Sequence, residues 1–448
     1  MKNLLHKRLT SFQIIIVGFL LVILTGSMLL MLPVSARNGR ITPFPDALFT
    51  ATSATCVTGL VVHDTATYWS AFGQAVILLL IQIGGMGVVT VAVSVAVISG
   101  RRIGLMQRST MQEAIAAPSV GGIVRLTGLI LKATIFIELI GAVLMMPVFW
   151  KDQDFLKGTW YAFFHSISAF CNAGFDLMGG RQPFSSLTGY VGNNLINAVV
   201  LGLIVIGGIG FLTWDDIKCK GIHIRKYRMQ SKVILLTTGI LILVPFLLFL
   251  FGEFSRPVWD DMTLWNKLQA ALFQAITPRT AGFNTVDLTL FSEEGQAILI
   301  LLMLIGGSPG STAGGMKTTT AAVLFMTLFA VFRRKEDTEC FGRRIAENTI
   351  KYAATILMMY LTLFFTGGIL ISCLEGLPLG TCLFETASAI GTVGLSLGIT
   401  PGLGQLSRLI LIVLMFFGRV GGLTLVFAAS SVKGKNVSRL PKEKITVG

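Results

Sequence analysis

Long apolar stretches separated by short polar segments dominate the chain. Eight of these stretches are long enough to cross a bilayer whose hydrocarbon core is about 30 Å thick. They lie near residues 11–33, 72–99, 126–149, 191–213, 233–252, 296–331, 352–374 and 406–430. The pattern predicts an all-α integral membrane protein with eight transmembrane helices, arranged along the chain as four pairs.

The composition supports this class. Hydrophobic residues make up 53% of the chain and charged residues 13%, and the mean hydropathy is +0.76, which is outside the range of soluble globular proteins. The first apolar stretch is longer than the apolar core of a secretory signal peptide. It ends in Leu32-Pro33 and not in a small-residue cleavage site, so we expect it to be a retained span.

A phrase of eleven residues recurs between the two members of each pair. The copies are FTATSATCVTG, FHSISAFCNAG, LFQAITPRTAG and FETASAIGTVG, which end at Gly59, Gly174, Gly282 and Gly394. These glycines are 115, 108 and 112 residues apart, and a second small-residue landmark follows each copy at Gly84-Gly85, Gly207-Gly208, Gly306-Gly307 and Gly418-Arg419. Such a fixed period indicates four equivalent units around a central axis, which is how a pore is built.

The period divides the chain into four predicted repeats, each consisting of a helix, a pore loop and a second helix. We place them at 1–105, 106–220, 221–340 and 341–448, and the last repeat includes a cytoplasmic C-terminal tail. The phrases are too short to span a bilayer, so we read them as re-entrant segments. After the double glycine, the second helices of the first, second and fourth repeats are expected to continue as regular helix.

Lysine and arginine predict the orientation. The segments 1–8, 101–108, 218–232, 333–351 and 433–444 carry 23 of the 36 basic residues. By the positive-inside rule, both termini are cytoplasmic and the four phrases open outward, at a cell membrane. The net charge of +14 then needs no nucleic acid partner, because a basic inner rim contacts anionic membrane lipid.

Each phrase has the features of one quarter of an ion filter. Helix-compatible residues at 46–55, 161–170, 267–276 and 382–390 direct the negative end of a half-helix inward, and the tip then presents backbone carbonyls to a dehydrated cation. The predicted filter residues are Cys56, Val57, Thr58, Gly59, Cys171, Asn172, Ala173, Gly174, Arg279, Thr280, Ala281, Gly282, Gly391, Thr392, Val393 and Gly394. A lone glycine at such a place is usually a tight turn or a helix contact, but four in register favour the filter.

Polar residues follow the tips at Asp64, Asp176, Asn284 and Asp287. They are either an acidic mouth that concentrates cations or ordinary solvated loop residues, and the sequence leaves both readings open.

With these four phrases, the chain resembles the ion-conducting subunit of the Trk/Ktr/HKT superfamily of potassium transporters, most closely its KtrB-like branch. The resemblance covers essentially the whole chain and implies four non-identical repeats in one polypeptide. In the family, a serine at the first filter position goes with sodium selectivity and glycine in all four goes with potassium. Because all four are glycine here, we expect potassium uptake with potassium bound only at the filter carbonyls. A sodium-permeable or sodium-coupled member is the alternative, and a carrier of another solute is less favoured.

The third repeat departs from the others after its double glycine. Five glycines and one proline within ten residues disfavour a regular helix there. The resemblance places an intramembrane gating loop at this point. The alternative is a static kink for helix packing. The predicted gate residues are Gly306, Gly307, Ser308, Pro309, Gly310, Ser311, Thr312, Ala313, Gly314, Gly315 and Lys317, together with Arg419 of the last repeat.

Arg419 lies near the middle of an apolar stretch, where a cation is costly and usually faces a cavity. We expect an electrostatic barrier or a latch on the freed carbonyls of the loop, and a structural tie between helices is the alternative. Lys132 and Glu138 of the third stretch receive no transport role, although Glu138 could cap a polar contact between helices.

Other classes of protein find little support. The chain has no HExxH, GxSxG or Walker motif, and residues 310–317 lack the spacing of a phosphate-binding loop, so we predict no enzyme activity and no cofactor. The six cysteines show no metal-binding spacing. An alternating-access carrier usually has inverted repeats and midplane carboxylates, whereas these repeats are parallel.

The resemblance also implies partners. A separate cytosolic ring of the RCK type, similar to KtrA or TrkA, would bind ATP, ADP or NAD and control the gate, so the nucleotide is expected on that ring and not on this chain. A homodimer of two independent pores is implied as well. The basic loops at 218–232 and 333–351 are the natural docking candidates.

Overall fold

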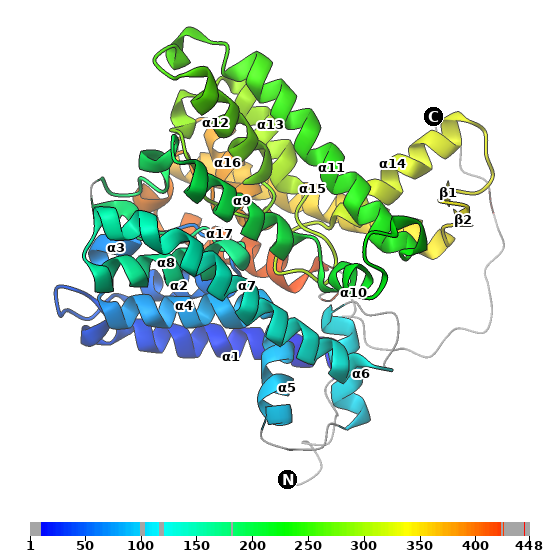
Figure 1. The fold of residues 1–448 in the computed structure, drawn as a ribbon, viewed down its shortest axis with the longest axis horizontal. Helices are drawn as coiled ribbons and strands as arrows, with labels where there is room; N and C mark the ends of the chain where they lie inside the picture. The colour runs from blue at the N-terminus through cyan, green and yellow to red at the C-terminus, as the bar shows by residue number, and fades with distance from the viewer. Residues whose placement is uncertain are drawn as a thin grey trace.

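The computed structural model describes residues 10–98, 104–115, 121–180, 182–422, 424 and 443. Four long helices are apolar enough to cross a membrane by length and composition: α1 (Ser11–Met31), α7 (Ile123–Asp152), α11 (Met229–Leu248, extended by a π-helical turn Phe249–Glu253) and α15 (Glu347–Glu375). Each is the first member of one predicted pair (Figure 1). The chain is therefore a helical membrane protein, as the hydropathy pattern predicts.

A short helix follows each long one. These helices are α2 (Phe44–Thr55), α8 (Phe155–Phe170), α12 (Leu264–Ile276) and α16 (Leu379–Gly391), so the four expected half-helices are confirmed. Each contains a fully buried phenylalanine near its middle or C-terminal half: Phe49, Phe164, Phe273 and Phe384. The first turns of these helices are exposed, whereas their C-terminal halves are buried almost completely, apart from Leu272 of α12, so their C-terminal ends lie inside the molecule.

The second member of each pair is broken. In the first predicted repeat, α4 (Ala71–Met86) is separated from α5 (Val88–Ile98) by Gly87; in the second, α9 (Asn194–Gly208) is separated from α10 (Phe211–Lys220) by a bend of 97° that contains Gly210. In the fourth, α17 (Gln405–Val420) ends at Gly421. The φ angles of these three glycines are 85°, 91° and 89°. The expectation of continuous second helices is therefore wrong, because a residue with strongly positive φ cannot continue a right-handed helix.

In the third repeat, α13 (Glu293–Leu304) and α14 (Thr318–Phe332) are separated by a non-helical stretch at 305–317. Because of these breaks, the described residues contain four helices that pass the test for a span, or five if α9 and α10 count as one. The number of eight spans, and the four repeat boundaries, stay predictions. The predicted C-terminal tail lies almost wholly outside the described residues, as does the basic segment 1–8.

Smaller elements complete the described chain. A two-stranded antiparallel hairpin, β1 (Glu339–Cys340) and β2 (Arg343–Arg344), follows α14. The short helices are α3 (Thr65–Tyr68) and α6 (Leu105–Ile115), and the 3₁₀ turns are Pro33–Ser35, Met178–Gly180, Thr188–Tyr190, Ile224–Lys226, Pro257–Trp259, Leu288–Leu290 and Thr400–Gly402.

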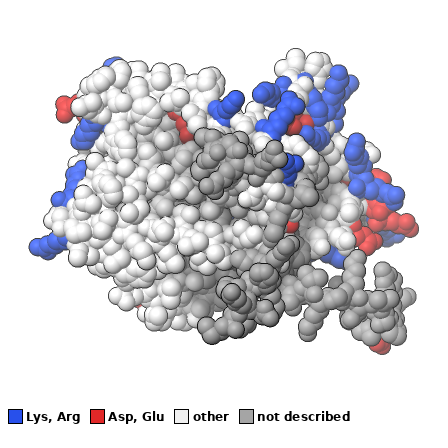
Figure 2. All heavy atoms as spheres, turned by 90° about the horizontal axis from the view of Figure 1, so that it is seen from below, with Lys and Arg blue, Asp and Glu red and all other residues white. Residues whose placement is uncertain are grey.

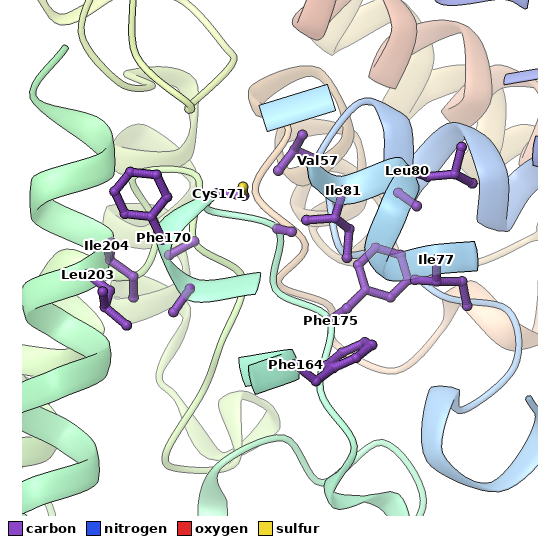
Figure 3. Packing of buried hydrophobic residues seen from close by; sticks show 14 of the residues in the cluster. Val57, Ile77, Leu80, Ile81, Phe164, Phe170, Cys171, Phe175, Leu203 and Ile204 are labelled. Carbon is purple, nitrogen blue, oxygen red and sulfur yellow. The ribbon is translucent and has the colours of Figure 1, made fainter. Parts of the chain in front are cut away.

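Two hydrophobic clusters hold the fold together. One joins the first and second predicted repeats, and Figure 3 shows part of it, with Val57 near Ile81 and with Phe164, Phe175 and Ile77 close together. The other joins the third and fourth repeats. On the face seen in Figure 2, the described Lys and Arg side chains lie mostly toward the two ends of the long axis, and the described surface between them carries few charges, as expected of a surface that faces lipid.

Candidate functional site

The four phrase-ending glycines meet at one place. A β-carbon placed on Gly59 would lie 2.5 Å from the carbonyl oxygen of Ala173, and one placed on Gly174 would lie 2.9 Å from that of Ala281. In the same way, Gly282 abuts the carbonyl oxygen of Val393 and Gly394 that of Thr58. Each glycine thus faces the carbonyl that precedes the next glycine, in the cyclic order first, second, third, fourth, first. Any side chain at these positions would collide with the ring.

The backbone in front of each glycine is strained in the same way. The residue two positions earlier has a positive φ in all four segments: Val57 (57°), Asn172 (58°), Thr280 (71°) and Thr392 (51°). The glycines themselves have φ of 94°, 69°, 79° and 94°. A left-handed conformation costs a non-glycine residue on the order of 1–3 kcal/mol and persists only where the surroundings impose it, and such strain clusters at functional sites. The sequence predicts positive φ at the glycines but has no signal for it at Val57 or Thr280.

Hydrogen bonds tie each strained segment to its own short helix. The N–H groups of Thr58, Ala173 and Val393 donate to the carbonyls of Ser53, Ser168 and Ser388, each at 2.8 Å. In the third segment, the N–H of Ala281 instead reaches only four residues back, to Thr277, at 2.9 Å.

The third segment is therefore one residue shorter. Phe273 and not Leu272 is the counterpart of the buried phenylalanines Phe49, Phe164 and Phe384. The third phrase is predicted to begin at Leu272, eleven residues counted back from Gly282. The residue equivalent to the first residue of the other phrases is Phe273, so the predicted start is wrong by one residue.

Other predicted filter residues turn their side chains away from the ring. Cys56 and Cys171 are fully buried. Arg279 is buried too, and its guanidinium donates to the hydroxyl of Thr238 on α11 at 3.4 Å. Glu138 of α7 accepts from Gln82 of α4 at 3.2 Å, so the expected polar contact between helices is present.

The glycine ring opens into a cavity of about 580 Å³. Gly59, Gly174, Gly282 and Gly394 all line it, together with the four polar residues that follow the tips, Asp64, Asp176, Asn284 and Asp287. Burial raises the pKa of Asp176 to about 7; the hydrogen bond from the Met178 N–H opposes this rise and the nearby charge of Asp64 adds to it. The described residues thus place an acidic mouth next to the ring.

The stretch 305–317 crosses to the neighbouring broken helices. The N–H groups of Ser308 and Thr312 donate to the carbonyls of Gly208 (3.0 Å) and Gly207 (3.3 Å), and the N–H of Phe211 donates to Gly310 at 2.7 Å. The Thr312 hydroxyl also donates to the carbonyl of Phe170, the last residue of α8, at 3.0 Å. The loop therefore packs against the bend between α9 and α10 and is hydrogen-bonded to it.

The two ends of this loop come together. The N–H of Gly306 donates to the carbonyl of Met316 at 2.8 Å, and a β-carbon placed on Gly306 would lie 3.0 Å from the Cα of Gly315. On the side of the fourth repeat, the Gly315 N–H donates to the carbonyl of Gly418 at 3.1 Å. The two ends of the loop are therefore adjacent, and the loop contacts α9 and α10 on one side and α17 on the other.

Two basic side chains, Arg419 and Lys317, donate hydrogen bonds to carbonyls of the loop. Arg419 donates to the carbonyls of Thr312, Gly84 and Gly85, so it connects the loop to the first repeat as well. Lys317 donates to the carbonyls of Ala313 (2.8 Å) and Gly314 (3.3 Å). Both cations line a second cavity, of about 290 Å³, on the side of the loop where Ile15 and Tyr360 also lie.

The described residues thus form a helical membrane protein in which four short helices bring four glycines and the neighbouring carbonyls to one point. The profile of the family TrkH, described as cation transport protein, matches residues 6–439, so the chain belongs to this family.

Curated relatives and a solved structure agree with this family. The chain is 38% identical to the potassium/sodium uptake protein NtpJ of Enterococcus hirae, over 100% of this chain and 99% of that protein. It is 39% identical to the Ktr system potassium uptake protein B of Bacillus subtilis, over 98% and 97%. The crystal structure of the potassium transporter TrkH from Vibrio parahaemolyticus superposes with a TM-score of 0.72 at 22% identity, over 95% of this chain and 86% of that chain, and so shares the fold.

Proposed function

We propose that this chain is the pore-forming subunit of a potassium uptake system in the cell membrane. The observation that carries the proposal is the cyclic contact of four glycines with four carbonyls at the base of an acidic cavity. Carbonyl rings of this kind replace the hydration shell of a cation. Family membership and the names of the relatives point the same way.

The choice of potassium over sodium depends on glycine in all four positions. Three relatives are named as potassium uptake proteins and one as a potassium/sodium uptake protein, so the names alone leave a sodium-permeable pore open. The close approach of Gly59 to Ala173 and of Gly394 to Thr58 leaves no space for the β-carbon of serine. Because glycine in all four positions goes with potassium in the family, we propose a potassium-selective pore.

The loop at 305–317 is proposed as the gate, with Arg419 as its latch. Support comes from the backbone hydrogen bonds that the loop makes to the second and fourth predicted repeats. The basic side chains of Lys317 and Arg419 lie beside the loop, and Arg419 also reaches two carbonyls of the first predicted repeat. A cation in the pathway of a cation is an electrostatic barrier. The competing role, a fixed tie between helices, predicts no effect of the loop on conduction.

Control by a cytosolic nucleotide-binding ring is the remaining part of the proposal, together with a homodimer and cytoplasmic termini. The relatives named as proteins of a Ktr system indicate a transporter with more than one component. In this chain, the hairpin β1–β2 presents the exposed Arg343 and Arg344 directly after α14, the helix that leads away from the loop. A ring bound there would be connected to the gate through α14.

Growth rescue tests the function. Expression of the chain in a bacterium that lacks its own potassium uptake systems should restore growth at low potassium, and more so with a co-expressed soluble regulator. Rubidium uptake by the same cells should rise in parallel, because rubidium substitutes for potassium in carbonyl sites. Failure to restore growth while the protein is present in the membrane would contradict potassium uptake.

The pKa of Asp176 predicts a dependence on external pH. Since its pKa is raised to about 7, the carboxyl is ionised above neutral pH and neutral in acid. One unit charge at the mouth contributes about 1 kcal/mol at short range in water, so flux should fall a few-fold between external pH 8 and pH 5.5. The measurement is rubidium uptake into proteoliposomes at fixed internal pH.

Two variants complete this test. Asp176→Asn should have the low flux at both pH values, and so lose the pH dependence. Asp287→Asn, which removes another acid from the same cavity, should lower flux without removing the pH dependence. A full pH dependence in Asp176→Asn would show that another group is responsible.

A further inference from the structure

Each short helix has a buried polar residue at one equivalent position, directly after its buried phenylalanine. These residues are Thr50, His165, Gln274 and Glu385, and none is more than 1% exposed. A buried polar group is costly unless it is hydrogen-bonded. Their hydrogen bonds therefore show what each residue does for its segment, and the four differ.

His165 of α8 is bonded to the chain that leaves the second glycine. Its Nε2 accepts from the N–H of Leu177, three residues after Gly174, at 3.3 Å, and its Nδ1 lies 2.7 Å from the carbonyl oxygen of Tyr161. A carbonyl only accepts and a backbone N–H only donates, so the proton must be on Nδ1 and the lone pair on Nε2. The ring of Phe283, which follows the third glycine, lies beside it with centroids 6.4 Å apart.

Glu385 of α16 makes the same connection in the fourth segment. Its carboxylate accepts from the N–H of Leu397, three residues after Gly394, at 3.1 Å. It also accepts from the hydroxyls of Ser396 (2.6 Å) and Thr400 (2.7 Å). Three hydrogen bonds thus converge on one buried side chain and fix the chain that leaves the fourth glycine.

The other two residues at this position do not make this connection. The Thr50 hydroxyl donates within its own helix, to the carbonyl of Asp46 at 3.0 Å. Among the residues that the structure describes, neither the amide nitrogen nor the amide oxygen of Gln274 has a hydrogen-bond partner.

The first and third exits are held from other places. His63, four residues after Gly59, contacts Asp46 at the start of α2 at 3.0 Å. The N–H of Asn284, two residues after Gly282, donates to the hydroxyl of Ser186 in the outer loop of the second repeat at 3.1 Å.

We propose that His165 and Glu385 are positioning residues that set cation selectivity by holding the exits of the second and fourth filter segments. In the cyclic order of the glycines, Gly174 and Gly394 are opposite each other, each flanked by Gly59 and Gly282. The hydrogen bonds of His165 to Leu177 and of Glu385 to Leu397, which we call the two clamps, therefore hold the chain three residues beyond two opposite glycines. The line from Gly174 to Gly394 is one diagonal of the ring. This inference rests on the proposed function as a cation filter.

Selectivity is the property that such clamps control. A filter discriminates through the spacing and number of its carbonyls around the ion. If the chain just past a glycine is released, the backbone carbonyls of that filter segment can move closer to a smaller ion. The free-energy cost of replacing potassium by sodium in the filter then falls. The first and third segments, which lack the clamp, already have other ties, so the diagonal from Gly174 to Gly394 is the one that these two side chains determine.

The test uses the full-length protein in proteoliposomes and the ratio of rubidium to sodium uptake. Glu385→Ala and His165→Leu should each lower this ratio about tenfold, the value of one buried hydrogen bond to a charged or ring acceptor. Glu385→Gln should keep the ratio near that of the unsubstituted protein, because its amide oxygen still accepts from Leu397 and Ser396. Gln274→Leu is the matched control: it changes the same position in the third helix, where no bond is lost, and should leave the ratio unchanged.

The results distinguish a failure of the proposed clamps from a failure of the proposed filter. An unchanged ratio in Glu385→Ala and His165→Leu, while Gly59→Ser alters it, would overturn the clamps and leave the filter intact. Unchanged ratios in all of these variants would overturn the filter itself. An equal loss in Glu385→Gln and Glu385→Ala would overturn the positioning role, since charge and not hydrogen bonding would then be responsible. Should Glu385→Ala fail to fold, His165→Leu still decides, because an unchanged ratio in that variant would overturn the proposal.

Discussion

Removal of residues Ser308–Gly314 is expected to raise ion flux about tenfold or more in the absence of any soluble partner, which is within the range of coupling energies that regulate gates. The excision removes the bonds of Ser308 and Thr312 to the bend between α9 and α10 and the carbonyl that Arg419 holds. The chain can be rejoined because the two ends of the loop already touch at Gly306 and Gly315. Rubidium efflux from proteoliposomes measures the result.

Arg419→Ala is the milder version of this change and Arg419→Lys its control. The alanine variant should speed conduction, because both the latch and the positive charge are gone. The lysine variant keeps the positive charge but lacks the planar guanidinium that reaches Thr312, Gly84 and Gly85 together. Its flux should therefore lie between that of the unsubstituted protein and that of Arg419→Ala. Unaltered flux in the deletion variant would contradict the proposal that the loop at 305–317 is a gate. Loss of folded protein in both Arg419 variants would favour a structural tie.

Gly59→Ser is expected to lower the preference for potassium over sodium by about tenfold, the order of energy stored by a non-glycine residue forced to positive φ. Gly59 has φ of 94°, and a β-carbon there would lie 2.5 Å from the carbonyl oxygen of Ala173 and 3.2 Å from the Cα of Gly174. The first and second segments must therefore separate, which widens the ring on one side. Parallel uptake of rubidium and sodium by proteoliposomes gives the ratio.

Gly39→Ser is the matched control. Gly39 has φ of 66° and no atom within 4 Å of the position of a β-carbon, so serine there brings similar backbone strain without a clash at the ring. Its uptake ratio should equal that of the unsubstituted protein. An unchanged uptake ratio in Gly59→Ser would contradict the assignment of Gly59 to the filter.

Local features explain why the short helices could be predicted from the sequence. The predicted ends at residues 55, 170 and 276 are the ends of α2, α8 and α12, and α16 ends one residue beyond the predicted 390. Small and hydroxyl residues followed by a glycine stop a helix through short-range backbone preferences, which the sequence displays directly.

The strained residues could not be predicted in this way. Val57 and Thr280 are β-branched, and their own preferences disfavour positive φ. They adopt it where each segment leaves its short helix, between the backbone hydrogen bond back to that helix and the glycine that contacts a neighbouring segment. The breaks at Gly87, Gly210 and Gly421 were missed for a related reason, since each glycine lies in an apolar stretch that by itself permits a helix.

The sequence by itself determined the membrane class, the four glycine-tipped segments and the residues at which their helices stop, because hydropathy, period and glycine content are properties of short or repeated stretches. Only the tertiary structure decided that Gly59, Gly174, Gly282 and Gly394 touch in a cycle, that the loop after Gly306 rests on the second and fourth repeats, and that His165 and Glu385 hold the exits while Thr50 and Gln274 do not. Those contacts join residues about a hundred or more positions apart, or depend on which way a buried polar side chain turns. They follow from packing between segments, which no local pattern encodes.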